Sequence, residues 1–494
     1  MSETELKLLL PGADAARIAE QLARHPALRR RPRQVQQLHN VYYDTPDQAL
    51  RRQKVALRVR RQTTGEPPSE LWILTLKTAG TSVGGLSQRG EWEATLRSAT
   101  PRLSALQGTP WSTLDPDGTL WPQLAPTFVT SCTRTLWWLR LRGGSVIEVA
   151  LDVGEIVAGG RRAPICELEL ELKSGPPEAL HALAHRLAAA VAVLPGQASK
   201  AERGYALARD EAALPTRARP AALSGQMRLP AVLTGVLAEM WDQTLRNAAL
   251  LTHSDEPEPL HQARVGWRRL RSTTRLLRPL LGAAPATPAL RAFWQATGPV
   301  RELDVMLTDT LPAVAQAYVD GDPQRQAEWD TVLEAVRVAR AQVAAAMRLR
   351  LADPATGQGW LVWGEWLAAV APLPAHAEGQ ETKATDADHW PAWVAQRLRR
   401  QHKRLTQLGK TAHSDAERHA LRLRAKRLRY GAEAFASVLP KRRALRWQQD
   451  AGRAQLDEGR QRDLRQCVLW LSQLAVPAGP LAFMRGVCAG LLSR

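Results

Sequence analysis

Polar or charged side chains alternate with apolar ones in segment after segment of the first 207 residues. Successive side chains of a β-strand point to opposite faces, so each segment predicts a strand with one charged and one apolar face. The alternation begins at Glu3 and returns in residues 55–60, 71–77, 88–96, 145–152 and 165–173. Strands this numerous predict an antiparallel sheet or barrel, interrupted by helices expected at 13–25 and 178–191.

The charged faces carry both signs. Glu3, Glu5 and Lys7 share one face of the first segment, and Arg58 and Arg60 share a face of the second. An open sheet whose charges form ion pairs in solvent is one interpretation of this pattern. A closed barrel is the other: its apolar faces would pack outward, and its charged faces would line the interior. The uniformity of the charged faces favours the barrel.

A barrel interior of this kind suits one class of ligand. Rows of carboxylates hold a hard divalent cation such as Mg²⁺ through oxygen. Arg and Lys side chains hold phosphate oxygens, and the metal ion bridges the two kinds of charge. The first 207 residues therefore predict a site for a compact polyphosphate, with hydrolysis as the expected reaction.

The strand pattern does not continue through the chain. Residues 208–224 are rich in Pro, Ala and Arg and lack periodicity, which predicts a linker. Residues 225–494 are dominated by Ala, Leu and Arg at helical spacing, as in 331–352, with a loop expected at 372–390. The sequence thus predicts an α+β domain at 1–207 followed, after the linker, by an all-α domain.

The helical part carries most of the excess positive charge. The formal net charge of the chain is +19, and residues 209–494 hold 41 Lys and Arg against 28 Asp and Glu. Such an excess predicts a polyanionic partner, which leaves nucleic acid, polyphosphate and an acidic membrane surface open. The basic residues are not interleaved with stacking aromatic residues and no RNA-binding motif is present, which argues against nucleic acid.

A weak internal repeat runs through the helical part. LHQARVGWRRLRS contains His261, and RHALRLRAKRLRY contains His419, 158 residues later. Superposing the histidines aligns Arg264 with Arg422, Arg268 with Lys426 and Arg271 with Arg429, and RELD (301–304) matches RQRD (460–463) at nearly the same spacing. On a helix, the four positions of each copy form one stripe. The repeat predicts two related helical bundles; facing stripes would form a basic groove, and a solvated helix face is the alternative.

Other features bear on compartment and partners. Four cysteines are too few and too scattered for a disulfide framework or a CxxC metal site. No apolar run approaches the roughly 18 residues of a membrane helix, and the charged start is unlike a signal peptide. We expect a cytoplasmic protein without a membrane partner.

Residues 3–7, ETELK, resemble the ExExK signature of the CYTH superfamily, the triphosphate tunnel metalloenzymes. Further motifs follow in the order of the family: YYDTPD, ALRVR, LTLK, RGEWE, TRTLWWL, EVALD, CELELELKSG and SKAERGY. The ordered set carries the resemblance, which covers essentially all of residues 1–207. It implies an eight-stranded antiparallel barrel that forms a tunnel, hydrolysis of a triphosphate, and Mg²⁺ as the cofactor, with Mn²⁺ as the alternative.

The resemblance also implies roles for individual residues. The metal ligands would be Glu3, Glu5, Asp152, Glu167, Glu169 and Glu171. The phosphate oxygens would be bound by Lys7, Arg58, Arg60, Lys77, Arg89, Arg134 and Lys200. The expected catalytic set is Glu3, Glu5, Lys7, Arg58, Arg60 and Lys77.

The helical part resembles the CHAD domain, which implies polyphosphate binding by the two stripes: His261, Arg264, Arg268, Arg271, His419, Arg422, Lys426 and Arg429. The tandem arrangement is similar to that of bacterial inorganic triphosphatases. The expected function is metal-dependent hydrolysis of inorganic triphosphate to pyrophosphate and phosphate, with long-chain polyphosphate bound by the helices. Hydrolysis of another triphosphate, such as thiamine triphosphate or a nucleotide, and non-catalytic polyphosphate binding or targeting are the alternatives.

Overall fold

The computed structural model describes residues 2–11, 14–212, 214–370, 390–412 and 414–492. The loop expected at 372–390 therefore lies outside the described residues except for Trp390. Contacts divide the chain into two compact units, which are described separately below. The barrel unit comprises residues 1–215 and 351–373, and the helical unit comprises 216–350 and 374–494.

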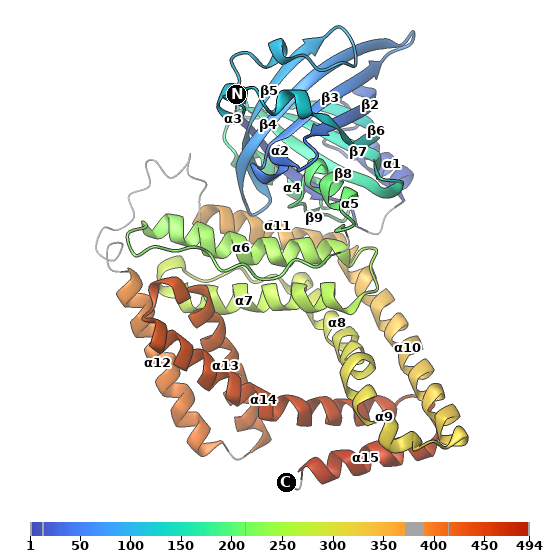
Figure 1. Cartoon of the computed structure of the whole chain (residues 1–494), viewed down its shortest axis with the longest axis vertical. Helices are drawn as coiled ribbons and strands as arrows, with labels where there is room; N and C mark the ends of the chain where they lie inside the picture. Colours follow the sequence, from blue (N-terminus) through green and yellow to red (C-terminus); the bar gives the residue numbers. More distant parts are fainter. Residues whose placement is uncertain (1, 12–13, 213, 371–389, 413, 493–494) are drawn as a thin grey trace. The chain divides into compact units, whose positions relative to one another are not determined.

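The barrel unit is built on eight antiparallel strands that close into a barrel (Figure 1). The strands are β1 (Ser2–Leu9), β2 (Arg33–Asp44), β3 (Ala56–Thr64), β4 (Ser69–Val83), β5 (Leu86–Leu96), β6 (Ala125–Arg140), β7 (Val146–Ala158) and β8 (Arg161–Ser174). Their order is β5-β4-β3-β2-β6-β7-β8-β1, and pairing of β1 with β5 closes the ring. The two-residue strand β9 (Leu194–Pro195) pairs with β1 as an addition. The predicted eight-stranded antiparallel barrel is confirmed.

The apolar faces of the strands point outward, and the charged faces point into the barrel. Leu6 and Leu168 belong to the outward set and are fully buried. On another side of the barrel, Leu57 and Leu76 pack with Trp111 beneath the short helices η1 (Leu103–Leu106) and α3 (Trp111–Leu114). Burial of these faces stabilises the closed barrel, since apolar burial is worth roughly 25 cal/mol per Å².

One end of the barrel is filled by apolar side chains, which we call the plug. Tyr42, Phe128, Ile156 and Ile165 belong to the inward-facing registers of four strands, and they pack with Tyr205. Tyr205 lies in α5 (Lys200–Ala208), which contacts β6, β7 and β8. The Tyr42 and Phe128 rings stack with their centroids 4.4 Å apart. The strand ends around Glu3 and Glu171 form the opposite end, the mouth.

The remaining helices of the barrel unit are α1 (Ala15–Arg24), α2 (Ala49–Arg52), the 3₁₀ turn η2 (Trp121–Gln123), α4 (Glu178–Leu187) and α11 (Pro354–Val370). Helix α11 packs on α4 and β9, and a Cβ at Gly364 would lie 2.3 Å from the carbonyl oxygen of Gly84. His185 contacts Gln358 at 2.6 Å and Glu365 at 3.1 Å. This helix lies within the stretch that the sequence assigns to the helical domain at 225–494; that boundary, and the linker at 208–224, stay predictions.

The helical unit contains no strand among its described residues. Its helices are α6 (Leu229–Leu250), α7 (Pro257–Leu281), α8 (Pro288–Val305), the π-helical turn η3 (Met306–Thr310), α9 (Pro312–Val319), α10 (Pro323–Leu351), α12 (Trp390–Thr411), α13 (Asp415–Ala434), the turn η6 (Ala436–Val438), α14 (Lys441–Leu471) and α15 (Ala478–Leu492). The predicted all-helical region is confirmed. The two copies of the repeat fall on α7 and α13, which contact each other. No helix in the described ranges is long and apolar enough to cross a membrane.

Candidate active site

The charged side chains of β1, β7 and β8 meet in the barrel because of the strand register. Lys7 lies opposite Glu169, and Asp152 lies opposite Glu167. Opposite residues of an antiparallel pair project to the same face. Glu5 and Glu171 face each other in the same way, nearer the mouth.

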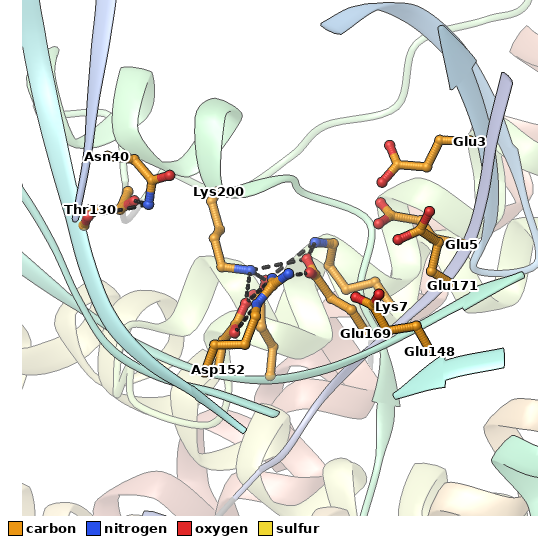
Figure 2. A network of polar contacts seen from close by, with 12 residues as sticks. Glu3, Glu5, Lys7, Asn40, Thr130, Glu148, Asp152, Glu169, Glu171 and Lys200 are labelled. Atoms are coloured by element: carbon orange, nitrogen blue, oxygen red, sulfur yellow. Dashed lines mark hydrogen bonds and ion pairs between the residues drawn. The ribbon is translucent and has the colours of Figure 1, made fainter. Parts of the chain in front are cut away.

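Three carboxylates form a compact cluster beside the plug. Asp152, Glu167 and Glu169 offer oxygens that all lie within 4.8 Å of one another. Lys7 Nζ lies 2.5 Å from Glu169 and 3.2 Å from Glu167. Lys200 Nζ lies 2.5 Å from Glu167, 2.7 Å from Asp152 and 3.0 Å from Glu169 (Figure 2). We call these three carboxylates the deep acidic cluster.

The start of helix α5 places Lys200 in this cluster. The Ser199 side chain accepts a hydrogen bond from the backbone N–H of Glu202, and the Glu202 side chain accepts one from the backbone of Ser199. This reciprocal cap fixes the first turn of the helix. Arg203, three residues after Lys200, donates from Nη1 to Glu167 at 3.1 Å. Our sequence analysis missed Arg203, although its i,i+3 spacing from Lys200 places both on one helix face.

Arg134 joins the deep acidic cluster from β6. It donates to both oxygens of Asp152, at 2.7 and 2.6 Å, and to Glu169 at 2.7 Å. Burial raises the pKa of Asp152, but Arg134 and Lys200 outweigh burial and lower it to about 2. Burial likewise opposes ionisation of Glu169, whose pKa Lys200 and Lys7 hold well below its ordinary value. Both carboxylates are therefore ionised at neutral pH.

A second group of charges lies toward the mouth. Lys77 Nζ lies 2.9 Å from Glu3 and 2.9 Å from Glu91. Arg89 bridges the two glutamates of the ETELK motif, at 2.9 Å to Glu3 and 2.9 Å to Glu5. Burial raises the pKa of Glu3, but Lys77 and Arg89 outweigh it, and the net shift is downward.

Glu171 differs from the other carboxylates of the barrel. Figure 2 shows its side chain close to those of Glu3 and Glu5 and apart from the deep acidic cluster. Burial raises the pKa of Glu171 to about 7, with the carboxylates of Glu3 and Glu148 adding to the rise. Lys173, 2.6 Å from Glu171, opposes that rise. Lys173 therefore does not fully offset the mutual repulsion of the carboxylates of Glu171, Glu3 and Glu148.

The donor set of the barrel fits a hard divalent cation. All six predicted metal ligands project carboxylate oxygens into the interior, and such oxygens are the donors that Mg²⁺ and Mn²⁺ prefer. In this structure each of the six carboxylates lies in an ion pair with a Lys or Arg side chain. A bound cation would take over part of this neutralisation and leave the ammonium and guanidinium groups for an anion.

The wall formed by β3 is positive and lacks full compensation. Arg60 makes no ion pair within the described part of the chain and donates instead to the amide oxygen of Asn40, at 2.9 Å. Burial and the charges of Arg58 and Arg134 lower the pKa of Arg60 to about 10. Arg58 is held by Tyr42 at 3.4 Å and Glu91 at 3.9 Å, and its buried Nε finds no acceptor in the described ranges. The sequence analysis missed Asn40, because a single amide on a strand face that otherwise carries Leu38 and Tyr42 gives no periodic signal.

All the predicted barrel residues therefore face one interior. Lys7, Arg134 and Lys200 surround the deep acidic cluster, and the group at the mouth comprises Glu3, Glu5, Lys77, Arg89 and Glu171. Arg58 and Arg60 complete the wall on β3. Carboxylates for a cation and cationic groups for an anion thus face a common space.

In the helical unit, basic side chains from four helices gather into what we call the basic cluster. It comprises Arg264 and Arg268 of α7, Arg301 of α8, Arg422, Lys426 and Arg429 of α13, and Arg462 of α14. Burial and the charges of Arg268 and Arg422 lower the pKa of Lys426 to about 7. Burial and Arg268 lower that of Arg264 to about 10. Acidic side chains offset part of this charge: Glu433 lies 3.4 Å from Arg429, and Glu302 lies 3.6 Å from Arg462. The lowered pKa values of Lys426 and Arg264 indicate that positive charge still prevails in the basic cluster.

The structure does not bring all eight predicted stripe residues together equally. His261 lies beside the basic cluster, where burial and then Arg301 lower its pKa. Arg271 instead neighbours Arg275 and Arg291, which with burial lower its pKa. His419 lies in α13, but its side chain falls outside the described residues. The stripes alone did not predict Arg462.

Two family models match the chain. Residues 1–205 match the model of the CYTH domain, and residues 235–470 match the model of the CHAD domain. Among curated proteins, the N-terminal region is 38% identical over 209 residues to an inorganic triphosphatase of Haemophilus influenzae. That match covers 42% of this chain and 55% of the relative, so the chain spans about half the length of the relative.

Solved structures resemble each part separately. A CHAD domain from the plant Ricinus communis is 25% identical, with a TM-score of 0.44, over 56% of this chain and 91% of that chain. A Hippeastrum protein described as having a dominant triphosphatase activity is 19% identical, with a TM-score of 0.29, over 41% of this chain and 95% of that chain.

Proposed function

We propose that this chain, which combines a CYTH domain with a CHAD domain, hydrolyses inorganic triphosphate to pyrophosphate and phosphate inside its barrel, with Mg²⁺ as the cofactor. One observation carries the proposal: the uncompensated Arg60 and the deep acidic cluster face the same enclosed interior. An anion binder alone would not require six inward carboxylates, and a cation site alone would not require buried arginines. A compact anion that arrives with a divalent metal satisfies both sets.

Proposed roles follow from charge and position. The six predicted ligands, Glu3, Glu5, Asp152, Glu167, Glu169 and Glu171, would hold Mg²⁺, which when bound would neutralise phosphate charge and activate water. Arg58, Arg60 and Arg134 bind phosphate oxygens through their guanidinium groups. Lys7, Lys77, Arg89 and Lys200 surround the same space and supply further positive charge.

The reaction needs little covalent chemistry from the protein. The cationic side chains hold the triphosphate in line for attack by water on its terminal phosphorus. The new P–O bond forms as the bond to the leaving pyrophosphate breaks, and Arg and Lys side chains stabilise the charge that develops on the leaving oxygen. The plug keeps bulk solvent out of one end, so these charges act in surroundings of low dielectric constant.

The similarity to an inorganic triphosphatase supports inorganic triphosphate as the substrate. A substrate panel tests this choice directly: phosphate release from tripolyphosphate, ATP, thiamine triphosphate and long-chain polyphosphate, each with Mg²⁺, with Mn²⁺ and with EDTA. We expect the highest kcat/KM with tripolyphosphate and no release in EDTA. Absence of hydrolysis across the panel would refute the enzymatic proposal and favour a non-catalytic polyphosphate-binding protein.

A matched pair of variants tests the site. Glu5→Gln removes an inward carboxylate and keeps its shape, so Mg²⁺-dependent phosphate release should collapse while the circular dichroism spectrum stays unchanged. Glu155→Gln is the control, because Glu155 lies on the outward face of β7 and pairs with Arg162. Unchanged turnover in Glu5→Gln would contradict the assignment.

For the helical unit, we propose that the basic cluster binds long-chain polyphosphate. The proposal is supported by the arginine side chains that surround the half-buried Lys426 and lower its pKa. The buried Nε atoms of Arg264 and Arg268 also find no acceptor in the described part of the chain. Filter binding across a salt series, with polyphosphate against duplex DNA, separates the two polyanions. We expect Lys426→Ala to weaken polyphosphate binding and Lys441→Ala, an exposed change of equal charge, to leave it intact.

A further inference from the structure

His185 of α4 contacts two side chains of α11, and both helices belong to the barrel unit. Its Nδ1 atom lies 2.6 Å from Oε1 of Gln358, and its Nε2 atom lies 3.1 Å from a carboxylate oxygen of Glu365. Each ring nitrogen of His185 therefore faces an oxygen atom of the other helix.

The orientation of the Gln358 amide is fixed by a third contact. Its Nε2 atom donates to the backbone carbonyl oxygen of His185, at 2.6 Å. The amide nitrogen must face that carbonyl, because a carbonyl oxygen only accepts hydrogen bonds. Oε1 of Gln358 is therefore the atom that faces Nδ1 of His185, and Nδ1 must carry a proton.

Glu365 makes the same demand on the other ring nitrogen. Its side chain is 52% exposed, and an exposed glutamate is ionised at neutral pH. A neutral imidazole carries one proton, so with Nδ1 protonated the lone pair of Nε2 would face the carboxylate at 3.1 Å. Only the doubly protonated imidazolium donates to both oxygens, and in that state it also forms an ion pair with Glu365.

The other titratable groups of α4 leave this charge to His185. His181 lies one turn earlier in the helix and is 4% exposed, and neither of its ring nitrogens has a hydrogen-bond partner within the described ranges. Burial lowers the pKa of His181, so its ring stays neutral at pH 7. Glu178 and Arg186 carry the remaining charges of the helix.

The elements packed against α4 supply one charged partner. The strands that contact it, β1 and β8, present leucines such as Leu8 and Leu168 on their outward faces. His25, which follows α1, contacts the backbone carbonyl oxygen of Arg186 at 3.0 Å, and burial lowers the pKa of His25. Glu365 is the single charged residue of α11.

Helix α11 packs on elements that lie beside β1. It contacts β9, which pairs with β1. Directly after β9, the backbone N–H of Gly196 donates to the carbonyl oxygen of Lys7 at 2.8 Å. Gly364 of α11 packs closely against Gly84, in the turn between β4 and β5. The attachment of α11 therefore bears on the backbone next to Lys7.

We propose that His185 is a proton-dependent latch that holds α11 on the barrel unit. With both ring nitrogens protonated, the imidazolium joins α4 to α11. When the ring loses one proton to solvent, one nitrogen faces an oxygen with a lone pair, and α11 is held less tightly. Release of the latch then loosens β9 and the β4–β5 turn. This inference does not depend on the substrate of the barrel.

Histidine side-chain NMR tests the protonation state directly. At about pH 7 we expect both ring nitrogens of His185 to carry protons, whereas the exposed His253 should be mostly neutral, because an ordinary histidine loses its proton near about pH 6.5. The signal that disappears in His185→Gln identifies the residue. A ring of His185 with a single proton at that pH would overturn the inference.

Hydrogen exchange tests the consequence for α11. Between about pH 6 and about pH 9, the protection factors of its backbone amides should fall by about fivefold in the wild type, the scale of a partly exposed ion pair. They should be low at both pH values in His185→Gln. Glu365→Gln should show no fall, because its amide nitrogen can donate to a neutral Nε2.

The control is His253→Gln, which should behave as the wild type does. The fall should be confined to α11, β9 and the β4–β5 turn. Equal protection of α11 at both pH values in the wild type would overturn the latch. An equal fall in Glu365→Gln, or the same fall throughout the barrel unit, would also overturn it, because either result would assign the pH dependence to other groups.

Discussion

Arg60 donates a hydrogen bond from Nε to the Oδ1 atom of Asn40, at 2.9 Å, between adjacent strands of the barrel interior. Asn40 is 2% exposed, and its amide nitrogen donates to the Thr130 hydroxyl at 3.0 Å. The amide thus holds a buried guanidinium without neutralising it. A carboxylate at this position would fix Arg60 equally well but would cancel the charge that an anion needs.

Asn40→Ala should weaken substrate binding through Arg60. A hydrogen bond to a charged group is worth about 1.5–3 kcal/mol, so we expect KM for tripolyphosphate to rise by about tenfold or more. Asn40→Asp should raise KM further, because the new carboxylate would pair with Arg60. Steady-state kinetics measure both effects. The control is Thr133→Ala, which removes a side-chain hydrogen bond of 3.0 Å from β6 to Gln37 of β2, on the outward face of the barrel. Unaltered KM in both Asn40 variants would contradict this role.

Lys200→Met should tighten Mg²⁺ binding while lowering activity. Lys200 contacts all three carboxylates of the deep acidic cluster, and its removal takes away one positive charge that a metal ion can replace. Isothermal titration with MgCl₂, without phosphate, should show affinity higher by on the order of tenfold. Lys54→Met, which removes an exposed lysine, should leave the affinity unchanged. Weaker Mg²⁺ binding in Lys200→Met would show that the deep acidic cluster is not the metal site.

Glu171 should make stability depend on pH. Burial raises its pKa from the ordinary 4.5 to about 7. The native state therefore binds this proton more tightly than the unfolded state. Its stabilising contribution is complete below pH 4.5 and is lost as the pH rises to about 7. Glu171→Gln, which stays neutral, should be more stable than wild type by about 2 kcal/mol at pH 8 without Mg²⁺, and equal to it near pH 4.

Urea denaturation monitored at several pH values measures this difference. Glu155→Gln provides the comparison, since that carboxylate is on the outward face. Added Mg²⁺ should narrow the difference, because a cation near Glu171 stabilises its charged form only in the wild type. A constant difference between pH 4 and pH 8 would rule out the titration of Glu171 as its cause.

Polyphosphate binding by the helical unit should weaken as the pH rises above 7. Burial and neighbouring arginines lower the pKa of Lys426 to about 7, so this lysine loses its proton in a range where an ordinary lysine remains charged. A polyanion favours the protonated form, so binding takes up a proton between about pH 7 and 10. Lys426→Arg should hold its affinity up to pH 9, since arginine stays protonated. Parallel pH profiles of the two proteins would contradict the prediction.

Six strands of the barrel could be read from the sequence because each contains a stretch in which polar or charged residues alternate with apolar ones, even where, as at Ile156 of β7 and Ile165 of β8, the inward face later becomes apolar. Strands β2 and β6 gave no such signal, and the structure explains why. The inward face of β2 carries Asn40 and then Tyr42, and that of β6 changes from Phe128 to Arg134, because both strands run between the plug and the charged interior. A face that changes environment along one strand cannot show uniform alternation.

Residues of the candidate site were predictable where a charge recurs at every second position of one strand, as with Glu167 and Glu169. Asn40 and Arg203 were not, because their importance lies in a partner from another element: Arg60 on β3 and Glu167 on β8. The packing of α11 against the turn between β4 and β5 brings Gly84 and Gly364, 280 residues apart, into contact. Periodicity reports the faces of an element and carries no information on such distant pairings.

The plug has a kinetic consequence. Because Tyr42, Phe128 and Tyr205 fill one end, we expect whatever occupies the interior to arrive and depart at the mouth, beside Glu3 and Glu171. Products must then leave before another substrate molecule can be admitted. Pyrophosphate that returns from solution would occupy the same cations, and it should inhibit competitively with respect to tripolyphosphate.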